Sequence, residues 1–460
     1  MTLAKVLAEY IVAENYDDLP SDVVTKVKQC LLDSIGCALG GFAVEDGARL
    51  ARLMGKQGGN DATIFGSGAK TSVPYAALAN TYLGNILDYD DTYRGHPGCT
   101  VNSAAIGCGE SVHASGKDVL VASLVGYEIS SRVGASLHYS SSTLAKIRGI
   151  MHQTFGSVSS ACKILRLPTD QVEDALGIAG VTSPVQSNAK TSGEEGIPPT
   201  LKIGFYACSV IGVLSALLAK NGITGPHNIL DGDTGYWRMM AADGCDFDKI
   251  TNGLGVEHEI MKVAFKPYSC CRWFHSSLDA LFEILSEHKL EVNEIRKIVV
   301  QTMAGKSKEK VSYLMNPRPS NCVSAVFSLP YSVAVALSGI PPGPRWVSSH
   351  TMSDPEILGL AEKVECSIQE KPESEAIMDV HKWPATVQVV TGSSTYSKRT
   401  EYPRGSPKKM LTGEELDSKF LSLAEPVIGE ENARKVSEIV QSLEDLDDIS
   451  KLTALLKTTS

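Results

Sequence analysis

Helical periodicity runs through almost the whole first half of this chain, from Leu3 to about Ala219. Apolar residues recur at three- and four-residue spacing in segments such as VPYAALANTYLGNILDYDD and FYACSVIGVLSALLAKNG, and breaks at Gly or Pro separate the segments. Several segments are apolar nearly all round and rich in Ala, Gly and Ser. Such helices belong inside a bundle and can approach one another closely, so the sequence predicts a multi-helix domain.

Patterns typical of strands appear after Pro267. EIRKIVVQTMA, EKVECSIQE and ATVQVVTGSSTYSKRTEYP are rich in β-branched residues and alternate as strands do. The last of them contains a turn signal at Gly392-Ser393-Ser394 and therefore predicts two strands. The segment FSLPYSVAVALSGIPPG predicts a helix that ends at Gly339 and the two prolines after it.

Helical periodicity returns beyond Pro407 and continues to the last residues. A chain of 460 residues is too long for one simple core, so two domains are expected. We therefore predict a mainly α fold with a smaller α/β domain. The all-helical bundle domain would be built from residues 1–265 and 401–460, and an α/β lid domain would be inserted at residues 266–400.

The composition excludes several classes of protein. A net charge of −10 without any Lys/Arg run argues against a nucleic-acid partner. The eleven cysteines are scattered without a CxxC motif, which favours reduced thiols in a cytoplasm and argues against a metal site. The N-terminal segment reads as an amphipathic helix and not as a signal peptide. No apolar stretch is expected to reach the roughly 18–20 residues that a membrane span needs, so no membrane partner is expected.

The segment LGNILDYDDTYRGHPG is the strongest candidate for a functional site. An apolar run ends in a dense group of titratable and polar residues, namely Asp88, Asp90, Asp91, Thr92, Arg94 and His96. Burying so many charges without partners would cost several kcal/mol, so such groups persist where a protein must handle charge. The segment therefore predicts the floor of an active site. The alternative is a surface turn in which Asp91 or Thr92 caps the next helix.

Several strings together resemble the MmgE/PrpD family over about residues 5 to 425. They are GSGAKTSVPYAALANTYLGNILDYDDTYRGHPG, GITGPHNILDG, FKPYSCCRWFHSSLDA, AVFSLPYSVAVAL and PRGSPKKMLTGEELDSKF. The resemblance implies a helical domain made from both ends of the chain, a smaller α/β lid, a homodimer, and no metal or organic cofactor. The family contains 2-methylcitrate dehydratases, cis-aconitate decarboxylases and an iminodisuccinate epimerase. Each of these reactions moves a proton on carbon beside a carboxylate, which requires a base and nearby cations.

The resemblance carries the family's acidic motif over to Asp88, Thr92 and His96. The loop between the Thr and the His is shorter here, so Arg94 is expected near the substrate mouth, where it could clamp a carboxylate. An exposed Arg without contacts is the alternative. His152 in RGIMHQTFG resembles a family histidine, and a buried His bonded to the backbone is its alternative.

The family lysine is missing from its usual position. Relatives carry it three residues before Lys202, where this chain has Pro199. A three-residue step on a helix nearly returns to the same face, so Lys202 could supply the amine from the next turn. The alternative is that the lysine role is lost and Lys202 is only a cation on a helix face; Lys190 in the preceding loop is a second candidate for the amine. Tyr313 in SYLMNPRP matches a family tyrosine, with a turn-packing tyrosine as the alternative.

The segment KPYSCCRWFH supplies three more cationic or titratable side chains near the domain junction, Lys266, Arg272 and His275. Arg272 and His275 are three residues apart at the start of a helix and could hold a carboxylate with help from the helix dipole. The alternative is an inter-domain salt-bridge cluster in which Asp279 is the acidic partner.

These observations predict a cofactor-independent enzyme that acts on a small di- or tricarboxylate. His96 or His152 would move the proton and Asp88 would orient an imidazole. We expect dehydration of a citrate-like acid first, because it is the commonest reaction of the family; decarboxylation and epimerisation are alternatives, as is an inactive carboxylate-binding or scaffold homologue. The predicted catalytic residues are Asp88, Thr92, His96, His152, Lys202 and Tyr313, and the predicted substrate-binding residues are Arg94, Lys266, Arg272 and His275.

Overall fold

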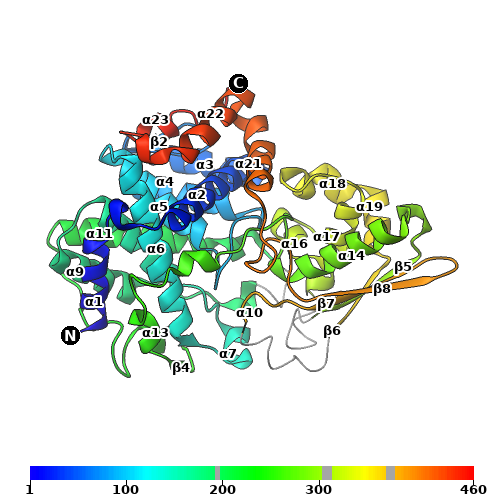
Figure 1. Ribbon diagram of the computed structural model, residues 1–460, viewed down its shortest axis with the longest axis horizontal. Helices are drawn as coiled ribbons and strands as arrows, with labels where there is room; N and C mark the ends of the chain where they lie inside the picture. The colour runs from blue at the N-terminus through cyan, green and yellow to red at the C-terminus, as the bar shows by residue number, and fades with distance from the viewer. Residues whose placement is uncertain (192–196, 303–312, 369–378, 460) are drawn as a thin grey trace.

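The computed structural model describes residues 1–191, 197–302, 313–368 and 379–459. A large helical part lies beside a smaller part in which helices accompany a four-stranded sheet (Figure 1). The fold is therefore mainly α with a smaller α/β portion, as the sequence predicted.

Helices form where apolar residues recur at helical spacing in the first 262 residues. The α-helices there are α1 (Leu3–Ala13), α2 (Ser21–Phe42), α3 (Glu45–Gly55), α4 (Val73–Asn85), α5 (Pro97–Ser111), α6 (Gly116–Ser136), α7 (Ser141–Lys146), α8 (Gln153–Ile164), α9 (Thr169–Thr182), α10 (Asn188–Thr191), α11 (Ile203–Lys220), α12 (Tyr236–Met239) and α13 (Asp248–Thr251). The shorter elements among them are the 3₁₀ helices η1 (Tyr16–Asp18), η2 (Pro199–Lys202) and η3 (Glu259–Lys262) and the strands β1 (Ala62–Thr63), β2 (Lys70–Thr71), β3 (Leu137–His138) and β4 (Gly244–Cys245).

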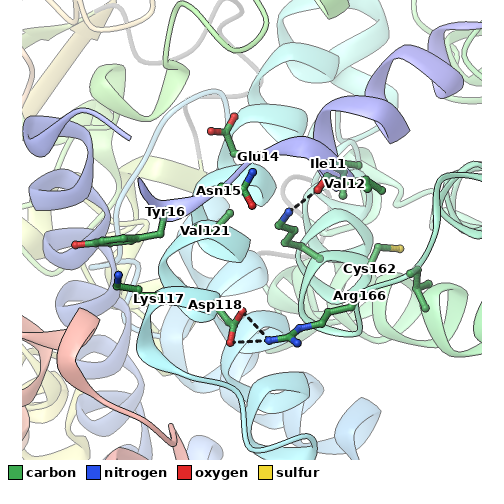
Figure 2. A pocket seen from close by; sticks show the side chains of 12 residues that line it. Ile11, Val12, Glu14, Asn15, Tyr16, Lys117, Asp118, Val121, Cys162 and Arg166 are labelled. Carbon is green, nitrogen blue, oxygen red and sulfur yellow. Dashed lines mark hydrogen bonds and ion pairs between the residues drawn. The ribbon is translucent and has the colours of Figure 1, made fainter. Parts of the chain in front are cut away.

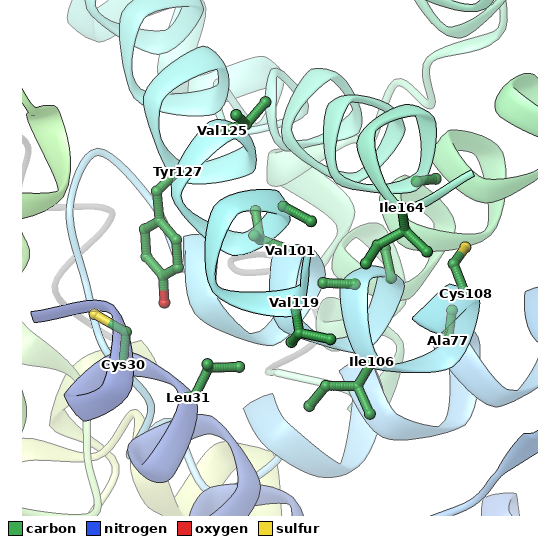
Figure 3. Packing of buried hydrophobic residues seen from close by; sticks show 14 of the residues in the cluster. Cys30, Leu31, Ala77, Val101, Ile106, Cys108, Val119, Val125, Tyr127 and Ile164 are labelled. Atoms are coloured by element: carbon green, nitrogen blue, oxygen red, sulfur yellow. The ribbon is translucent and has the colours of Figure 1, made fainter. Parts of the chain in front are cut away.

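The core of the helical part forms where α5, α6 and α8 pack together. Val101 of α5, Val119 and Val125 of α6 and Ile164 of α8 belong to one cluster of buried apolar side chains (Figure 3). Small residues let α6 and α8 approach: a Cβ atom added at Gly126 would lie only 2.1 Å from Ser160 Oγ. The close packing expected from the small residues is therefore confirmed here.

The α/β part contains one sheet with the strand order β6-β5-β7-β8. The strands are β5 (Lys297–Thr302), β6 (Val364–Ile368), β7 (Ala385–Val390) and β8 (Thr395–Thr400). β5 pairs in parallel with β6 and antiparallel with β7, and β7 and β8 form a hairpin around the predicted Gly392–Ser394 turn. The predicted strands are thus confirmed.

Helices of the α/β part pack against this sheet and against one another. They are η4 (Arg272–Phe274), α14 (His275–His288), η5 (Val292–Glu294), η6 (Tyr313–Met315), α16 (Cys322–Val326), α17 (Leu329–Leu337), η7 (Pro344–Val347), α18 (Ser349–Ser353) and α19 (Pro355–Ala361). α14 contacts β7 and β8, whose side chains alternate between buried and partly exposed along β7. α17 ends just before Gly339, as the sequence predicted.

The end of the chain returns to the helical part. α21 (Gly413–Ile428), α22 (Glu430–Gln441), η8 (Leu443–Asp445) and α23 (Ser450–Thr453) follow the sheet, and α21 packs along α2 (Figure 1). The contact is close, because a Cβ atom at Gly36 would lie 3.0 Å from Phe420 Cδ2. The domain limits at residues 265/266 and 400/401 remain predictions.

One described helical stretch, Pro199–Lys220, is long and apolar enough to cross a membrane by length and composition. This differs from the expectation that no apolar stretch would reach that length. Its most apolar window is 56% buried inside the protein, and α11 packs against α4, α8 and α9. A core helix has the same apolar character because it is surrounded by other helices.

Candidate active site

The acidic motif lies in the buried connection between α4 and α5. Asp88, Asp90 and Asp91 are 2%, 0% and 0% exposed, so the predicted burial is confirmed and the surface-turn alternative is wrong. The capping part of that alternative is correct for Asp91, whose Oδ1 accepts a hydrogen bond from the main-chain N of Gly98 in the first turn of α5. Asp91 also accepts a hydrogen bond from the Tyr127 hydroxyl.

Asp88 holds two buried ammonium groups. Lys202 Nζ lies 2.5 Å from Asp88 Oδ1, and Lys266 Nζ lies 2.8 Å from Oδ2 and 2.7 Å from the main-chain oxygen of Asp88. Asp88 has a φ of +49°, a left-handed conformation that few residues other than Gly adopt. Burial alone would raise the pKa of Asp88, but the charges of Lys202 and Lys266 hold it well below its usual range. Asp88 is therefore an anion that gathers two cations.

Lys202 supplies an amine at the acidic motif, although Pro199 occupies the usual position of the family lysine. Lys202 ends η2, just before α11, and its side chain is fully buried. Its Nζ also lies 5.1 Å from the centroid of the Phe327 ring. Burial lowers the pKa of Lys202 from its ordinary value despite the neighbouring carboxylate of Asp88. An amine therefore reaches the acidic motif from the turn after Pro199, and Lys202 is not a surface cation.

His96 and Asp90 form a hydrogen-bonded dyad. His96 Nδ1 is 3.1 Å from both carboxylate oxygens of Asp90, which also accepts hydrogen bonds of 3.0 Å from Asn85 Nδ2. Burial opposes ionisation of Asp90, but His96 and Lys266 keep its pKa below the usual value. The ionised carboxylate can only accept, so Nδ1 donates and Nε2 carries the lone pair.

The Nε2 atom of His96 faces the lysine cluster. It lies 3.9 Å from Asp88 Oδ1, which is too long for a hydrogen bond. Burial lowers the pKa of His96, so its imidazole is neutral near pH 7. The prediction that Asp88 orients the imidazole is wrong: Asp90 does so, because both carboxylate oxygens of Asp88 are occupied by lysines.

Thr92 and Arg94 shape the tight loop before His96. Thr92 Oγ1 donates to the Gly95 oxygen over 2.9 Å, and the main chains of Thr92 and Ala264 exchange two hydrogen bonds. Arg94 has a φ of +53°, and its guanidinium carbon lies 5.5 Å from the centroid of the Tyr93 ring. Arg94 Nε is buried and has no hydrogen-bond partner among the described residues.

His152 supports this loop through its ring nitrogens. Nε2 donates to the Arg94 main-chain oxygen over 3.1 Å, and Nδ1 lies 3.5 Å from Ser130 Oγ. Burial lowers the pKa of His152 to about 4, so the ring is neutral. This contact to the backbone matches the alternative considered for His152, and its catalytic role stays a prediction.

Arg272 begins η4 and His275 begins α14, and both side chains lie near Lys266. Arg272 Nη1 donates to the main-chain oxygens of Arg404 over 3.0 Å and Phe265 over 3.5 Å, and His275 Nε2 donates to the Cys270 oxygen over 3.1 Å. Asp279 accepts instead from the Arg404 main-chain N and the Tyr268 hydroxyl.

The alternative considered for Arg272 and His275, a salt-bridge cluster with Asp279 as the acidic partner, is therefore wrong. Burial and the charge of Arg272 hold the pKa of His275 well below its usual range, so His275 is neutral. Tyr313 begins η6, but its side chain lies outside the described part of the structure, and its role stays a prediction.

Two residues of this cluster escaped the sequence analysis as site residues. Asp90 was seen in the motif, but no spacing rule distinguishes it from Asp88 as the partner of His96. Lys419 of α21 donates to Asp33 Oδ1 over 2.6 Å and to the main-chain oxygens of Tyr89 and Lys266 over 2.7 and 3.1 Å. Lys419 thus holds the main chain of both segments that carry site residues, the one at Tyr89 and the one at Lys266. It lies more than 150 residues from either segment in the sequence, and the local sequence gives no sign of these contacts.

A surface cavity of about 360 Å³ lies elsewhere, between α1, α6 and the end of α8 (Figure 2). α8 begins next to His152, and the cavity adjoins its other end, about 15 Å away at 1.5 Å per residue. Two of its cations are already paired, Arg166 with Asp118 and Lys163 with the main-chain oxygen of Val12. The buried cluster around Asp88, and not this cavity, is therefore the candidate site.

Among the described residues, no group of three His, Cys, Asp or Glu side chains is arranged to hold a metal ion. The acidic groups of the cluster are instead paired with lysines and a histidine. The arrangement therefore offers a neutral imidazole base, two buried ammonium groups and, next to them, the guanidinium of Arg272. Such a set can bind an anion and move a proton beside it.

Comparison with known proteins identifies the family of the chain. The model of the MmgE/PrpD N-terminal domain matches residues 5–247, and that of the MmgE/PrpD C-terminal domain matches residues 268–445. A cis-aconitate decarboxylase of Aspergillus terreus (strain NIH 2624 / FGSC A1156) is 26% identical over 96% of this chain and 93% of its own length. Cis-aconitate decarboxylases of Mus musculus and Homo sapiens are 25% and 26% identical, each over 95% of this chain and 90% and 91% of their own lengths. The chain belongs to the MmgE/PrpD family.

Proposed function

We propose that this protein is a lyase that acts on a small carboxylic acid with two or three carboxylates, without a cofactor. Lys202 and Lys266 would hold a carboxylate next to the reacting carbon, and the open Nε2 of His96 would take or return the proton. The observation that carries the proposal is the convergence of Asp88, Lys202, Lys266 and the Asp90–His96 dyad in one buried cluster. The buried position of Lys202 beside Asp88 also supports an active enzyme over an inactive homologue.

Decarboxylation of a cis-aconitate-like acid is our first candidate reaction. The curated relatives that match nearly the whole chain carry that name. A dry, aromatic surrounding supports it as well, because Lys202 Nζ lies 5.1 and 5.9 Å from the ring centroids of Phe327 and Phe205. A desolvated carboxylate is destabilised, and it leaves as neutral CO₂ while the bonding electrons remain on carbon. Adjacent cations stabilise that charge until a proton is returned to carbon.

Dehydration, which the sequence favoured, is the second candidate. The neutral imidazole of His96 supports it, since Nε2 can remove a proton from the carbon beside a carboxylate. The electron pair then forms the double bond, and the hydroxyl leaves as water after a buried ammonium group protonates it. Epimerisation would use the same proton removal and return the proton to the opposite face.

Product analysis in heavy water tests the proposal. The protein is incubated separately with cis-aconitate, 2-methylcitrate and an amino dicarboxylate, and the reactions are followed by NMR. Release of CO₂ indicates decarboxylation, a new carbon–carbon double bond with loss of water indicates dehydration, and deuterium in unconverted substrate indicates epimerisation. If no small di- or tricarboxylate is converted or bound, the proposal is wrong.

A matched pair of histidine variants ties any turnover to this cluster. His96→Gln removes the basic Nε2, whereas His113→Gln changes an exposed histidine that pairs with Asp448 far from the site. We expect His96→Gln to lose at least about 100-fold in kcat and His113→Gln to keep the wild-type rate.

A further inference from the structure

We infer that Arg272, Arg94 and His381 form a second anion subsite, which holds a carboxylate of the substrate remote from the reacting carbon. The inference rests on the proposed function and adds a specificity element to it. His381 lies just before β7 and was not among the residues that the sequence singled out.

Each of these three side chains has a buried nitrogen atom without a hydrogen-bond partner among the described residues. These atoms are Arg272 Nη2, Arg94 Nε and His381 Nε2. Arg272 itself is only 7% exposed. Leaving a buried donor unsatisfied is costly, and most costly for a charged group, so native proteins rarely do so without a ligand or water in that place.

Ring contacts and hydrogen bonds bring the three side chains into one region. The imidazole of His381 stacks on the Tyr93 ring with centroids 5.6 Å apart and planes 14° apart, and the Arg94 guanidinium lies 5.5 Å from the same ring. Arg272 reaches the main-chain oxygen of Phe265, whose neighbour Ala264 is paired with Thr92. The main-chain pairing of Thr92 with Ala264 thus connects the segment that binds Arg272 to the loop that carries Tyr93. His381 and Arg94 both contact the Tyr93 ring.

The charge of the region suits an anion. Burial lowers the pKa of His381 to about 4, and the charges of Arg272, Arg94 and Lys26 contribute while Asp379 opposes. His381 is therefore neutral at pH 7, and in the tautomer with the proton on Nε2 it offers an N–H donor to a ligand that the charges of Arg272 and Arg94 attract. Asp379 has other partners, since it accepts from the His381 main-chain N and the Tyr402 hydroxyl. A carboxylate matches this set because it accepts several donors at once and balances the two arginines.

The second subsite lies next to the first one, which Lys202 and Lys266 form. Lys266 Nζ binds Asp88, while the oxygen of the preceding residue, Phe265, receives Arg272. His275 lies between them: its Nδ1 is 3.5 Å from Arg272 Nη1, and both Arg272 and Lys266 depress its pKa. Two carboxylates of one small molecule can therefore meet the lysines and the arginines at the same time.

Binding of tricarballylate, an unreactive saturated tricarboxylate, tests this subsite by isothermal titration calorimetry at pH 7. We expect His381→Ala to weaken binding about 10- to 100-fold, as for loss of a hydrogen bond to a charged group. His381→Gln keeps an N–H donor and should stay within about threefold of the wild type. Arg272→Gln should weaken binding at least as much as His381→Ala. The control is His350→Ala, which changes an exposed histidine of α18.

The outcomes separate the two proposals. Weakening by His381→Ala with recovery in His381→Gln supports the subsite. Unchanged affinity in His381→Ala overturns the subsite and leaves the proposed function standing. An equal loss of affinity in both His381 variants, together with a lower melting temperature, also overturns the subsite, because it shows a structural role for His381. If neither tricarballylate nor citrate binds the wild-type protein, the proposed function fails together with the subsite.

Discussion

Asp88 and Lys202 are 114 residues apart in the chain, yet their side chains form a fully buried ion pair of 2.5 Å. Lys266 completes the pair from a third segment, so one carboxylate is shared by two ammonium groups. Burying charges is costly, and the cluster is stable because each charge has an opposite charge and hydrogen bonds. The charges of Lys202 and Lys266 are balanced by the ionised Asp88 and Asp90, so the positive charge left to attract a further anion is the neighbouring guanidinium of Arg272.

Lys202→Met is expected to reduce kcat/KM at least about 100-fold, because one of the two cations beside the reacting carbon is lost. Asp88 keeps Lys266, so the loss of stability should remain below the roughly 3–5 kcal/mol of an orphaned buried charge. Steady-state kinetics and thermal unfolding measure the two effects. Lys220→Met, at the exposed end of the same helix α11, is the matched control. Equal activity in the two variants would remove Lys202 from the mechanism.

Asp90→Asn should reduce kcat by roughly 10²–10⁴-fold while leaving substrate affinity nearly unchanged, because His96 loses the anion that fixes its tautomer. The charge of Asp90 also supports the protonated form of His96, so its removal lowers the pKa of that imidazole further. The acidic limb of the pH profile of kcat/KM should therefore move to lower pH. A profile with an unshifted acidic limb would show that Asp90 does not act through His96.

Lys419→Met tests whether α21 positions the site. Lys419 binds Asp33 and the main-chain oxygens of Tyr89 and Lys266, so its loss leaves a buried carboxylate unpaired and should cost about 3–5 kcal/mol. We also expect kcat to fall more than KM rises, because Lys266 is held less firmly. Lys435→Met, which removes an exposed i,i+4 pair with Glu431 on α22, should change stability by less than about 0.5 kcal/mol. Loss of stability with unchanged kcat would make Lys419 purely structural.

Asp91 makes the free energy of unfolding depend on pH. Burial, with the charge of Asp33, raises the pKa of Asp91 to about 7. Between about pH 4 and 7 the unfolded chain loses this proton while the folded protein keeps it, so stability is full below the unfolded pKa and is lost as pH rises through the folded one. Glu128, also raised to about 7 by burial, acts in the same direction.

Asp91→Asn removes the contribution of Asp91, so the decline of stability from pH 4 to 8 should become smaller by roughly 2–4 kcal/mol. Urea unfolding at several pH values measures this decline. Asp61→Asn, at an exposed position, should leave it unchanged. A decline of wild-type size in Asp91→Asn would contradict the raised pKa.

Part of the site followed from local patterns. The apolar run before Asp88 predicted burial of the acids, and the resemblance to the family, with the three-residue step from Pro199, offered Lys202 as one candidate for an amine near the same place. Lys266 and Arg272 were expected near the junction because the change from helical to strand-type pattern lies there. The inferences about the acids and about the junction needed only neighbouring residues and the periods of helix and strand, whereas the one about Lys202 also needed the resemblance to the family.

Pairings between distant segments could not be predicted in this way. Nothing local distinguishes Asp88 from Asp90 as the partner of His96. Asp279, which was considered as the acidic partner of Arg272, accepts hydrogen bonds from Arg404 and Tyr268 instead. Lys419 and His381 reach the site from the last fifth of the chain.

The sequence alone therefore determined the helical body, the smaller sheet-containing part and the membership of the family, because periodicity and motifs are local properties of the chain. The tertiary structure alone decided which carboxylate binds which cation and which donors are left unpaired. Hydrogen bonds and ion pairs depend on distances of a few ångströms between segments that only the packing of the whole chain brings together.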